Sequence, residues 1–184
     1  IPPFCFCGCD ELKQEFAVSS VGKFGLYSCA SIERIASEKL NNCALAFCVE
    51  LKEIHSLSIV EDGALFNCKG LTQINRDVVL EKIGRFAFSG TGLLSLSFQG
   101  SFIGDYAFYK CNHLESVVLE KDIRYLGEYS FALCNDLREV VLPESLCGYG
   151  IGIECFKNCK SLEKIVIPEK AQFEHTKKEF FVEE

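Results

Sequence analysis

The feature that most constrains this chain is a repeat that can be counted from one cysteine to the next. Ile103-Gly-Asp-Tyr-Ala-Phe-Tyr-Lys-Cys-Asn-His-Leu-Glu-Ser-Val-Val-Leu119 recurs, with substitutions, in residues 126–142 and 151–167. The cysteine position is held in turn by Cys9, Cys29, Cys48, Cys68, Thr91, Cys111, Cys134 and Cys159, at intervals of 20, 19, 20, 23, 20, 23 and 25 residues. A period of this length predicts a solenoid, in which each coil packs on its neighbours.

Each repeat contains the parts of one coil. The apolar residues of Leu114-Glu-Ser-Val-Val-Leu119 end in an alternation, which predicts a short strand with one buried face. Ile103-Gly104 and its copies predict a second extended segment that ends in a tight turn. The Ala-Phe pair that follows would fill the space between the two walls, together with the pairs of neighbouring coils. About eight coils are expected.

These motifs resemble the leucine-rich repeats of the BspA type, also called the treponemal class, which occur in bacterial and some protist surface proteins. The resemblance covers roughly residues 4–168 and is most specific at 83–88, 103–119, 126–143 and 151–168. Earlier repeats carry Gly-Leu or Ala-Leu in place of Ala-Phe. The resemblance implies an α/β leucine-rich-repeat solenoid, a curved right-handed stack with a parallel β-sheet on its concave wall. Residues 1–168 would be the repeat domain.

Composition agrees with one domain and excludes two kinds of partner. Of the 184 residues, 48% are hydrophobic and 16 are Phe, yet no apolar run approaches the roughly 18 to 20 residues of a membrane span. The net charge of −7 argues against nucleic acid and against anionic membranes, because both favour a basic surface. The chain begins at Ile1 and contains no Met, so we expect a removed leader or a trimmed piece of a longer product.

The 12 cysteines suggest packing more than cross-linking. They make up about 6.5% of the chain, below the roughly 8 to 10% of disulfide scaffolds. Seven of them follow the repeat, and a thiol is small and easily buried. We therefore predict a ladder of mostly free, buried thiols at Cys9, Cys29, Cys48, Cys68, Cys111, Cys134 and Cys159.

The remaining cysteines, Cys5, Cys7, Cys43, Cys147 and Cys155, do not follow the repeat. Phe4-Cys-Phe-Cys-Gly-Cys9 is similar to a metal clip, but it lacks a second pair of ligands at the spacing of a zinc site. Strand alternation would put Cys5, Cys7 and Cys9 on one face. Incidental packing in the first coil or a disulfide near the terminus is the preferred explanation, and no metal or other cofactor is expected.

Catalytic signatures are missing from the sequence. The three histidines, His55, His113 and His175, lie in different repeats and at no zinc-binding or nucleophile-activating spacing, so we expect them on the surface. Gly148-Tyr-Gly-Ile-Gly152 does not have the spacing of a dinucleotide fingerprint; it predicts an enlarged turn that protrudes from the stack. We therefore expect no enzyme.

The outward face of the strands is the most informative surface. If Val117 and Leu119 point inward, then the alternate residues point outward in every repeat. One outward column is Arg34, Glu53, Gln73, Ser95, Ser116, Glu139 and Lys164, and the next is Ala36, His55, Asn75, Ser97, Val118, Val141 and Val166. Neighbouring strands lie about 4.8 Å apart, so Val118, Val141 and Val166, continued by Pro143 and Pro168, would form an apolar stripe. Valine also suits any strand, so the stripe is either a binding surface or simply good strand sequence.

The repeat pattern ends after Pro168. Residues 169–184 are rich in charges that a helix tolerates, and Phe173, Phe180 and Phe181 could supply an apolar face. Because a solenoid needs its last coil covered, we predict a C-terminal cap here; a mobile tail or the start of a further repeat is the alternative.

Function follows from the repeat and from the resemblance together. A solenoid offers broad surfaces and no obligatory cleft, which favours a non-enzymatic protein-binding module. Similarity to BspA-type proteins implies an adhesin-like virulence factor, extracellular, on the cell surface or periplasmic, that contacts extracellular-matrix or host-cell proteins through the concave sheet. The alternative is a structural protein that forms homo-oligomers through the apolar stripe.

Overall fold

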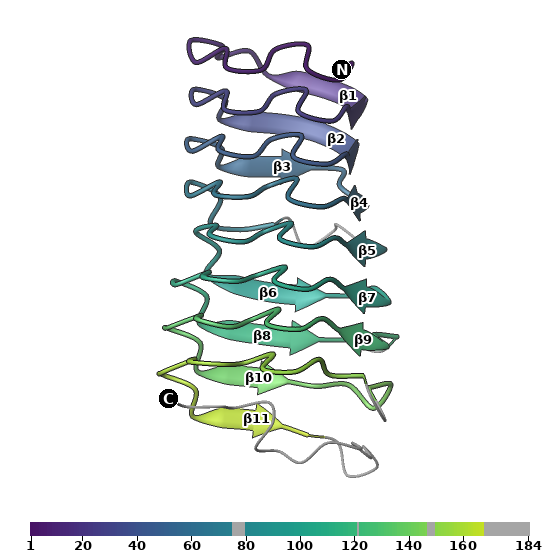
Figure 1. Ribbon diagram of the computed structural model, residues 1–184, viewed down its shortest axis with the longest axis vertical. Coiled ribbons are helices and arrows are strands. Elements are labelled where there is room, and N and C mark those ends of the chain that lie inside the picture. Colours follow the sequence, from purple (N-terminus) through teal and green to yellow (C-terminus); the bar gives the residue numbers. More distant parts are fainter. Residues whose placement is uncertain (75–79, 121, 147–149, 168–184) are drawn as a thin grey trace.

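The computed structural model describes residues 1–74, 80–120, 122–146 and 150–167, and these form a parallel β-solenoid (Figure 1). The coils are stacked in one column, with β1 near one end and β11 near the other. The predicted leucine-rich-repeat solenoid is confirmed. In the described residues the coils consist of strands and turns without a helix, because two short strands and one long turn use up a coil of 19 to 25 residues.

One side of the column, which we call the strand wall, carries the strands that follow the conserved leucine of each repeat. It contains the first part of β2 (Arg34–Leu40), β3 (Glu53–His55), β6 (Ser95–Phe98), β8 (Ser116–Leu119), β10 (Glu139–Val141) and β11 (Lys164–Val166). β2 pairs with β1 (Phe16–Val21) and β3, and β6, β8, β10 and β11 form a four-stranded sheet; every pair is parallel. The inward positions Val117 and Leu119 are buried, as the alternation predicts.

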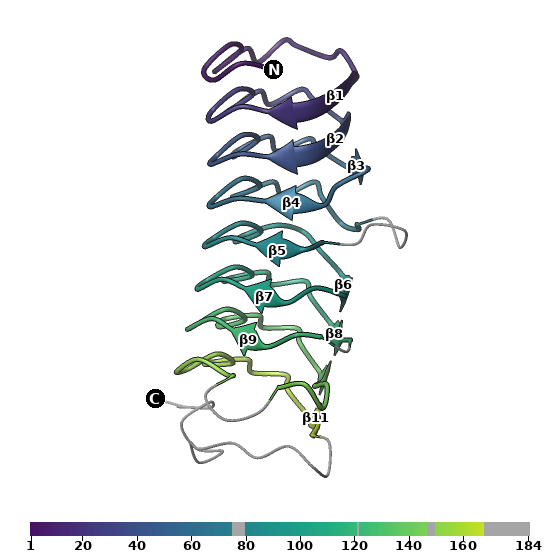
Figure 2. The ribbon, with the colours of Figure 1, turned by 90° about the vertical axis from the view of Figure 1, so that its right-hand side faces the viewer.

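The second side, the short-strand wall, carries the segment that precedes each glycine. It contains the ends of β1 and β2 together with β4 (Ile59–Val60), β5 (Lys82–Ile83), β7 (Phe102–Ile103) and β9 (Tyr125–Leu126), all paired in parallel (Figure 2). Ile151 continues this wall through a bridge to Leu126. These strands are the second extended segment that Ile103-Gly104 and its copies predict.

The third side, the turn wall, is built from one turn of eight residues per coil, such as Gly104–Cys111. Two residues four positions apart in each turn have a left-handed backbone. The first of them is Phe4, Phe24, Cys43, Gly63, Phe86, Tyr106, Tyr129 or Glu154, and the second is Gly8, Ser28, Phe47, Asn67, Gly90, Lys110, Leu133 or Asn158. These eight turns match the expected number of coils.

Hydrogen bonds between coils hold these left-handed turns in place. Tyr106 and Lys110 donate their N–H groups to Glu128 and Ala132 of the next coil, at 2.9 and 3.0 Å. Phe108 between them likewise donates to Ser130 of the next coil at 2.7 Å, whereas Ala107 and Tyr109 close short turns within the coil, by donating to Gly104 and Tyr106 at 3.3 and 3.1 Å. Left-handed backbone costs most residues about 1–2 kcal/mol, and this regular bonding makes it tolerable in every coil.

The core is a column of one large apolar side chain per coil, at the second position of the Ala-Phe pair. In the first part of the stack this residue is Leu26, Leu45 or Leu65, and in the second it is Phe88, Phe108, Phe131 or Phe156. The phenyl rings are stacked nearly parallel, with centroids 5.2, 5.1 and 5.6 Å apart along the column. Each coil is thus covered by the side chains of its neighbours, as a solenoid requires.

The cysteines that follow the repeat pack beside this column. Six of the seven thiols donate a hydrogen bond to a carbonyl of the preceding coil. Cys134 Sγ donates to Phe108 O at 3.2 Å, and the same bond joins Cys29, Cys48, Cys68, Cys111 and Cys159 to their preceding coils. Five of the seven are buried, whereas Cys159 is half-buried and Cys9 is exposed. The expectation of burial is wrong for Cys9, because the first coil has no preceding coil to receive it.

Two other expectations about cysteines change. Cys5, Cys7 and Cys9 do not share one face of a strand, because residues 3–8 form a turn with left-handed residues at Phe4 and Gly8; all three are exposed. Cys155 takes the small position of the Ala-Phe pair, where it is buried and lies 3.1 Å from Ser130 Oγ. The proposed cap (169–184) and most of the glycine-rich turn, including Cys147, lie outside the described residues.

Candidate functional site

The strand wall brings the two outward columns together in the expected register. Glu139 pairs with Ser116 and Lys164, and Ser116 with Ser95. Val141 pairs with Val118 and Val166, and Val118 with Ser97. In the first coils Arg34 pairs with Glu53, and Ala36 with His55. Gln73 is exposed but belongs to no strand, and Asn75 lies outside the described residues.

Three valines, Val118, Val141 and Val166, form what we call the valine patch, on β8, β10 and β11. Val118 and Val166 are exposed by 42% and 37%, and Val141 between them is half-buried. Because they are direct partners on adjacent parallel strands, their side chains stand side by side, about 4.8 Å apart. The strand wall therefore carries a contiguous apolar strip in its last three strands.

Pro143 does not extend this patch as expected. β10 ends at Val141, and the two residues that follow it, Leu142 and Pro143, are both buried. The alternation that places Val141 outward therefore ends with the strand. Pro168 lies outside the described residues. Pro143 is accordingly removed from the candidate binding residues.

The column beside the valines is polar and largely self-paired. Lys164 Nζ contacts Glu139 Oε1, and Ser116 next to them is half-buried. At the other end of the wall, Arg34 lies 3.3 Å from Glu53 and 3.5 Å from Glu15. These pairs are exposed, so each contributes at most about 1 kcal/mol. Glu139 and Lys164, on the same strands as Val141 and Val166, give the valine patch a charged rim, as binding surfaces commonly have.

The turn wall carries a second apolar surface that the repeat pattern does not predict. Its first left-handed position holds an aromatic ring in most coils, and rings on adjacent coils stack: Phe4 on Phe24 at 5.2 Å, Phe86 on Tyr106 at 4.8 Å and Tyr106 on Tyr129 at 5.0 Å. Cys43 and Gly63 interrupt this column. The sequence does contain a sign of this interruption, because a small residue stands two places before Leu45 and Leu65. This residue lies outside the core pattern, so the repeat does not draw attention to it.

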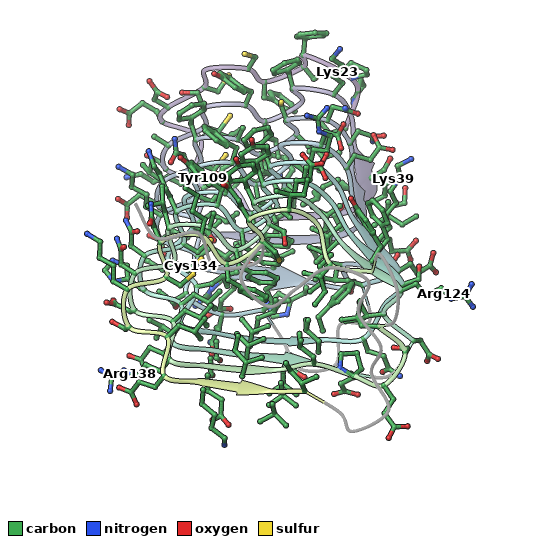
Figure 3. The ribbon with its side chains drawn as sticks, turned by 60° about the horizontal axis from the view of Figure 1, so that its bottom comes forward. Lys23, Lys39, Tyr109, Arg124, Cys134 and Arg138 are labelled. Atoms are coloured by element: carbon green, nitrogen blue, oxygen red, sulfur yellow. The ribbon has the colours of Figure 1, made fainter. Side chains whose placement is uncertain are left out.

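The interruption produces a groove of about 560 Å³ between Phe24 and Phe86. Cys43 and Gly63 form its floor, and Tyr27, Phe47 and Phe66 form one side with their rings 5.5 and 5.4 Å apart. The polar lining includes Lys23, Asp62 and Arg85, all exposed. In Figure 3, Lys23 lies at the outer edge of the stack, toward its N-terminal end.

The ladder thiols are suited to packing and not to nucleophilic chemistry. Burial raises the pKa of Cys48 to about 12 and that of Cys111 to about 11, so both remain protonated at neutral pH. Desolvation likewise raises the pKa of Cys43 in the groove. A reactive thiol needs a lowered pKa, and none of these three has one.

The histidines of the described residues do not form a catalytic arrangement with each other. His55 and His113 are exposed, and Glu53 and Asp136 lie beside them at 3.5 and 3.7 Å, respectively; His175 lies outside the described residues. Among the residues that the structure describes, no group of three or more His, Cys, Asp and Glu side chains could hold a metal ion. No helix in the same part of the chain has the length and apolarity for a membrane crossing.

Comparison with known families identifies the repeat. The family described as BspA type leucine rich repeat region matches six copies, in overlapping spans of residues 1–75, 34–150 and 58–183. The chain belongs to this family. A leucine-rich repeat protein of T. pallidum has a similar structure, with a TM-score of 0.71 and 27% identity over 79% of this chain and 72% of that one.

More distant structures show lower similarity. A leucine-rich cell surface protein from Faecalibacterium prausnitzii aligns over 97% of this chain and 84% of its own, with 16% identity and a TM-score of 0.37. A leucine-rich repeat protein from Bacteroides ovatus aligns over 94% and 78%, with 17% identity and a TM-score of 0.33. No curated protein sequence matches the chain. The family assignment therefore rests on the repeat itself and on the T. pallidum structure.

Proposed function

We propose that this leucine-rich repeat protein is a non-enzymatic binding module that recognises a partner protein through the strand wall, with the valine patch at the centre of the contact. The in-register exposure of Val118, Val141 and Val166 carries this proposal. Glu139, Lys164 and Ser116 form the polar rim beside them. A flat sheet face with an apolar centre and charged edge suits a protein surface better than a small molecule.

The patch is large enough to matter energetically. Covering the three valines and their surroundings would remove about 200–300 Å² of apolar surface from water, which at roughly 25 cal/mol per Å² is on the order of 5–7 kcal/mol before the costs of association. A contribution of this size could dominate a modest interface. Isolated apolar residues elsewhere, such as Leu94, cannot contribute as much, since each stands alone.

The partner that we propose is a protein of the extracellular matrix or of a host-cell surface, with this chain acting as an adhesin-like factor that is secreted or displayed on a cell surface. Membership of the BspA-type family supports this part of the proposal. The acidic net charge of −7 agrees with a protein partner and disfavours nucleic acid. The alternative is self-association, because an apolar patch on a flat sheet face could equally bind a second copy.

Replacing Val118, Val141 and Val166 together with Thr tests both alternatives. Thr keeps the β-branched shape and suits a strand, so the stability should hardly change. The variant should lose binding to matrix proteins in a pull-down, or lose self-association in light scattering over a concentration series, and the assay that changes identifies the partner class. Leu94→Thr is the matched control, because Leu94 is 50% exposed but lies outside the patch. A folded triple variant with unchanged behaviour in both assays contradicts the proposal.

A further inference from the structure

The groove on the turn wall is a gap in an otherwise continuous aromatic column. Rings at the first left-handed position stack at 4.8 to 5.2 Å wherever adjacent coils both carry one. Between Phe24 and Phe86 two successive coils, those of Cys43 and Gly63, carry no ring there. The gap therefore has the height of about two rings, since neighbouring coils lie about 4.8 Å apart.

The ends of the gap are aromatic surfaces without a stacking partner in their own column. Phe24 is stacked on Phe4 and Phe86 on Tyr106, each on the side away from the gap. Tyr27 contacts Phe24 with its edge, at 5.3 Å and 63°, so it does not take the place of the missing ring. An aromatic side chain that entered the gap would meet a ring face at one end and ring edges along one side, which are the preferred geometries of aromatic pairs.

The charges at the groove favour carboxylates at its two ends and an uncharged group between them. Lys23 Nζ lies 5.7 Å from the centre of the Phe24 ring, and Arg85 stands at the other end of the groove. Asp62 between them is exposed, and its Oδ1 accepts the backbone N–H of Arg85 at 2.8 Å, so its negative charge remains in the middle of the groove. Asp105 lies 3.5 Å from Arg85 Nε. The Arg85 side chain is 60% exposed, however, and its guanidinium has further N–H donors for a second carboxylate.

One segment of this chain has the required chemistry. Glu179-Phe-Phe-Val-Glu-Glu184 presents two adjacent phenyl side chains with carboxylates on both flanks. We propose that the groove binds this segment, with a phenyl ring entering the gap between Phe24 and Phe86 and the flanking glutamates meeting Lys23 and Arg85. The surface is separate from the strand wall, so the proposal does not depend on the function assigned to the valine patch.

The first test measures binding of a labelled peptide with the sequence of residues 176–184 by fluorescence anisotropy. The receptor is the full chain carrying Phe180→Ser and Phe181→Ser, so that its own segment does not compete. We expect saturable binding that a peptide with the same two Phe→Ser changes does not show. Absence of binding by the unmodified peptide overturns the proposal.

A matched pair of substitutions places the binding site. Cys43→Phe together with Gly63→Phe fills both ringless positions with a residue that the same turn position already accepts at Phe24 and Phe86, and the pair should weaken binding of the peptide at least tenfold. Glu154→Tyr introduces a ring at the equivalent position of the last coil, away from the groove, and should leave the affinity unchanged. Equal affinities for the two variants contradict the proposal.

Replacing Lys23 and Arg85 with Glu tests the contribution of charge. The double variant should weaken binding of the peptide about tenfold at low salt, and less at high salt.

The intact protein offers an independent measurement. Cys43 is half-buried in the groove floor, and its alkylation can be followed residue by residue by mass spectrometry under reducing conditions. We expect Cys43 to react several-fold more slowly in the unmodified chain than in the Phe180→Ser, Phe181→Ser variant, while the exposed Cys5 reacts equally in both. An unchanged rate at Cys43 contradicts occupation of the groove by this segment.

Discussion

The first and the second parts of the solenoid place their exposed apolar surface on different walls. In the coils before Phe86, the turn wall is opened into an aromatic groove, whereas the outward strand positions are small or polar, such as Ala36 and His55. In the later coils the turn wall carries a continuous ring stack from Phe86 to Tyr129, and the strand wall carries the valine patch. Columns on different walls thus vary independently, because each column contacts only its own neighbours along the stack.

The core differs between the same two parts. Leu26, Leu45 and Leu65 occupy the position that Phe88 and its successors occupy later. Both columns are fully buried, so either Leu or Phe can fill the interior of a coil at this position. The phenyl column adds ring stacking to area burial, at centroid distances of 5.1 to 5.6 Å. We therefore expect the second part to be the more sensitive to truncation of this position.

The largest effect should come from Phe108→Ala, which removes a ring stacked on both sides. We expect a loss of about 3–5 kcal/mol in the free energy of unfolding, from the cavity and the lost stacking. Leu45→Ala, at the same position of the first part, should cost less, toward the lower end of about 2–5 kcal/mol. Urea unfolding followed by circular dichroism measures both. If Leu45→Ala proves the costlier of the two, the proposed contrast between the columns is wrong.

Removal of residues 169–184 should have the next largest effect. The described part of the last coil is less covered than the coil before it: Leu162 and Ile165 are half-buried, whereas the equivalent Leu137 and Val140 are completely buried. If this segment caps the stack, its deletion should cost about 2 kcal/mol, or roughly 4–8 °C in the melting temperature, and should promote aggregation.

A single substitution narrows this test. Phe173→Ser should reproduce part of the loss, whereas Phe180→Ser with Phe181→Ser should affect the groove and not the cap. A deletion variant with an unchanged melting temperature and solubility would show that the last coil needs no cover from this segment. The boundary of the repeat domain at residue 168 would then have no structural meaning.

A smaller effect is expected from pH, through the buried thiols. The pKa of Cys48 is raised by burial to about 12, while an unfolded thiol titrates near the ordinary value of 9.0. Above pH 9 the unfolded chain therefore loses a proton that the folded chain keeps, and the free energy of unfolding falls as the pH rises toward 12. We expect this thiol to contribute a decline of about 1 kcal/mol between pH 8 and pH 10.

Comparison of variants isolates that contribution from lysines and tyrosines that titrate in the same range. Cys48→Ala should show a shallower decline of stability with pH than the unmodified protein, and Cys5→Ala, at an exposed thiol, should show the same decline as the unmodified protein. Alkylation in denaturant without reductant should also label Cys29, Cys48, Cys68, Cys111, Cys134 and Cys159. Disulfides at most of these positions would contradict the packing role.

The sequence was sufficient for the solenoid and for the direction of most side chains. Regular spacing of Leu114, Val117 and Leu119 with their copies sets the strand face, because a one-residue shift would expose the whole apolar set. It was not sufficient for Pro143, since alternation holds only while the strand lasts. Nor did it reveal the groove, because the core pattern is unaffected by Cys43 and Gly63; only the contacts between neighbouring coils show that they interrupt a ring column.

The most direct test of the account compares two adjacent valines of β8. Val117 is fully buried and Val118 is 42% exposed, and the assignment of the binding surface depends on this alternation. Val117→Thr places a hydroxyl in the core and should cost about 1–3 kcal/mol, whereas Val118→Thr should change the free energy of unfolding by less than about 0.5 kcal/mol. Urea unfolding of the two single variants decides the matter. If Val117→Thr is neutral and Val118→Thr is costly, the inward and outward faces of β8 are exchanged and the valine patch is not on the surface.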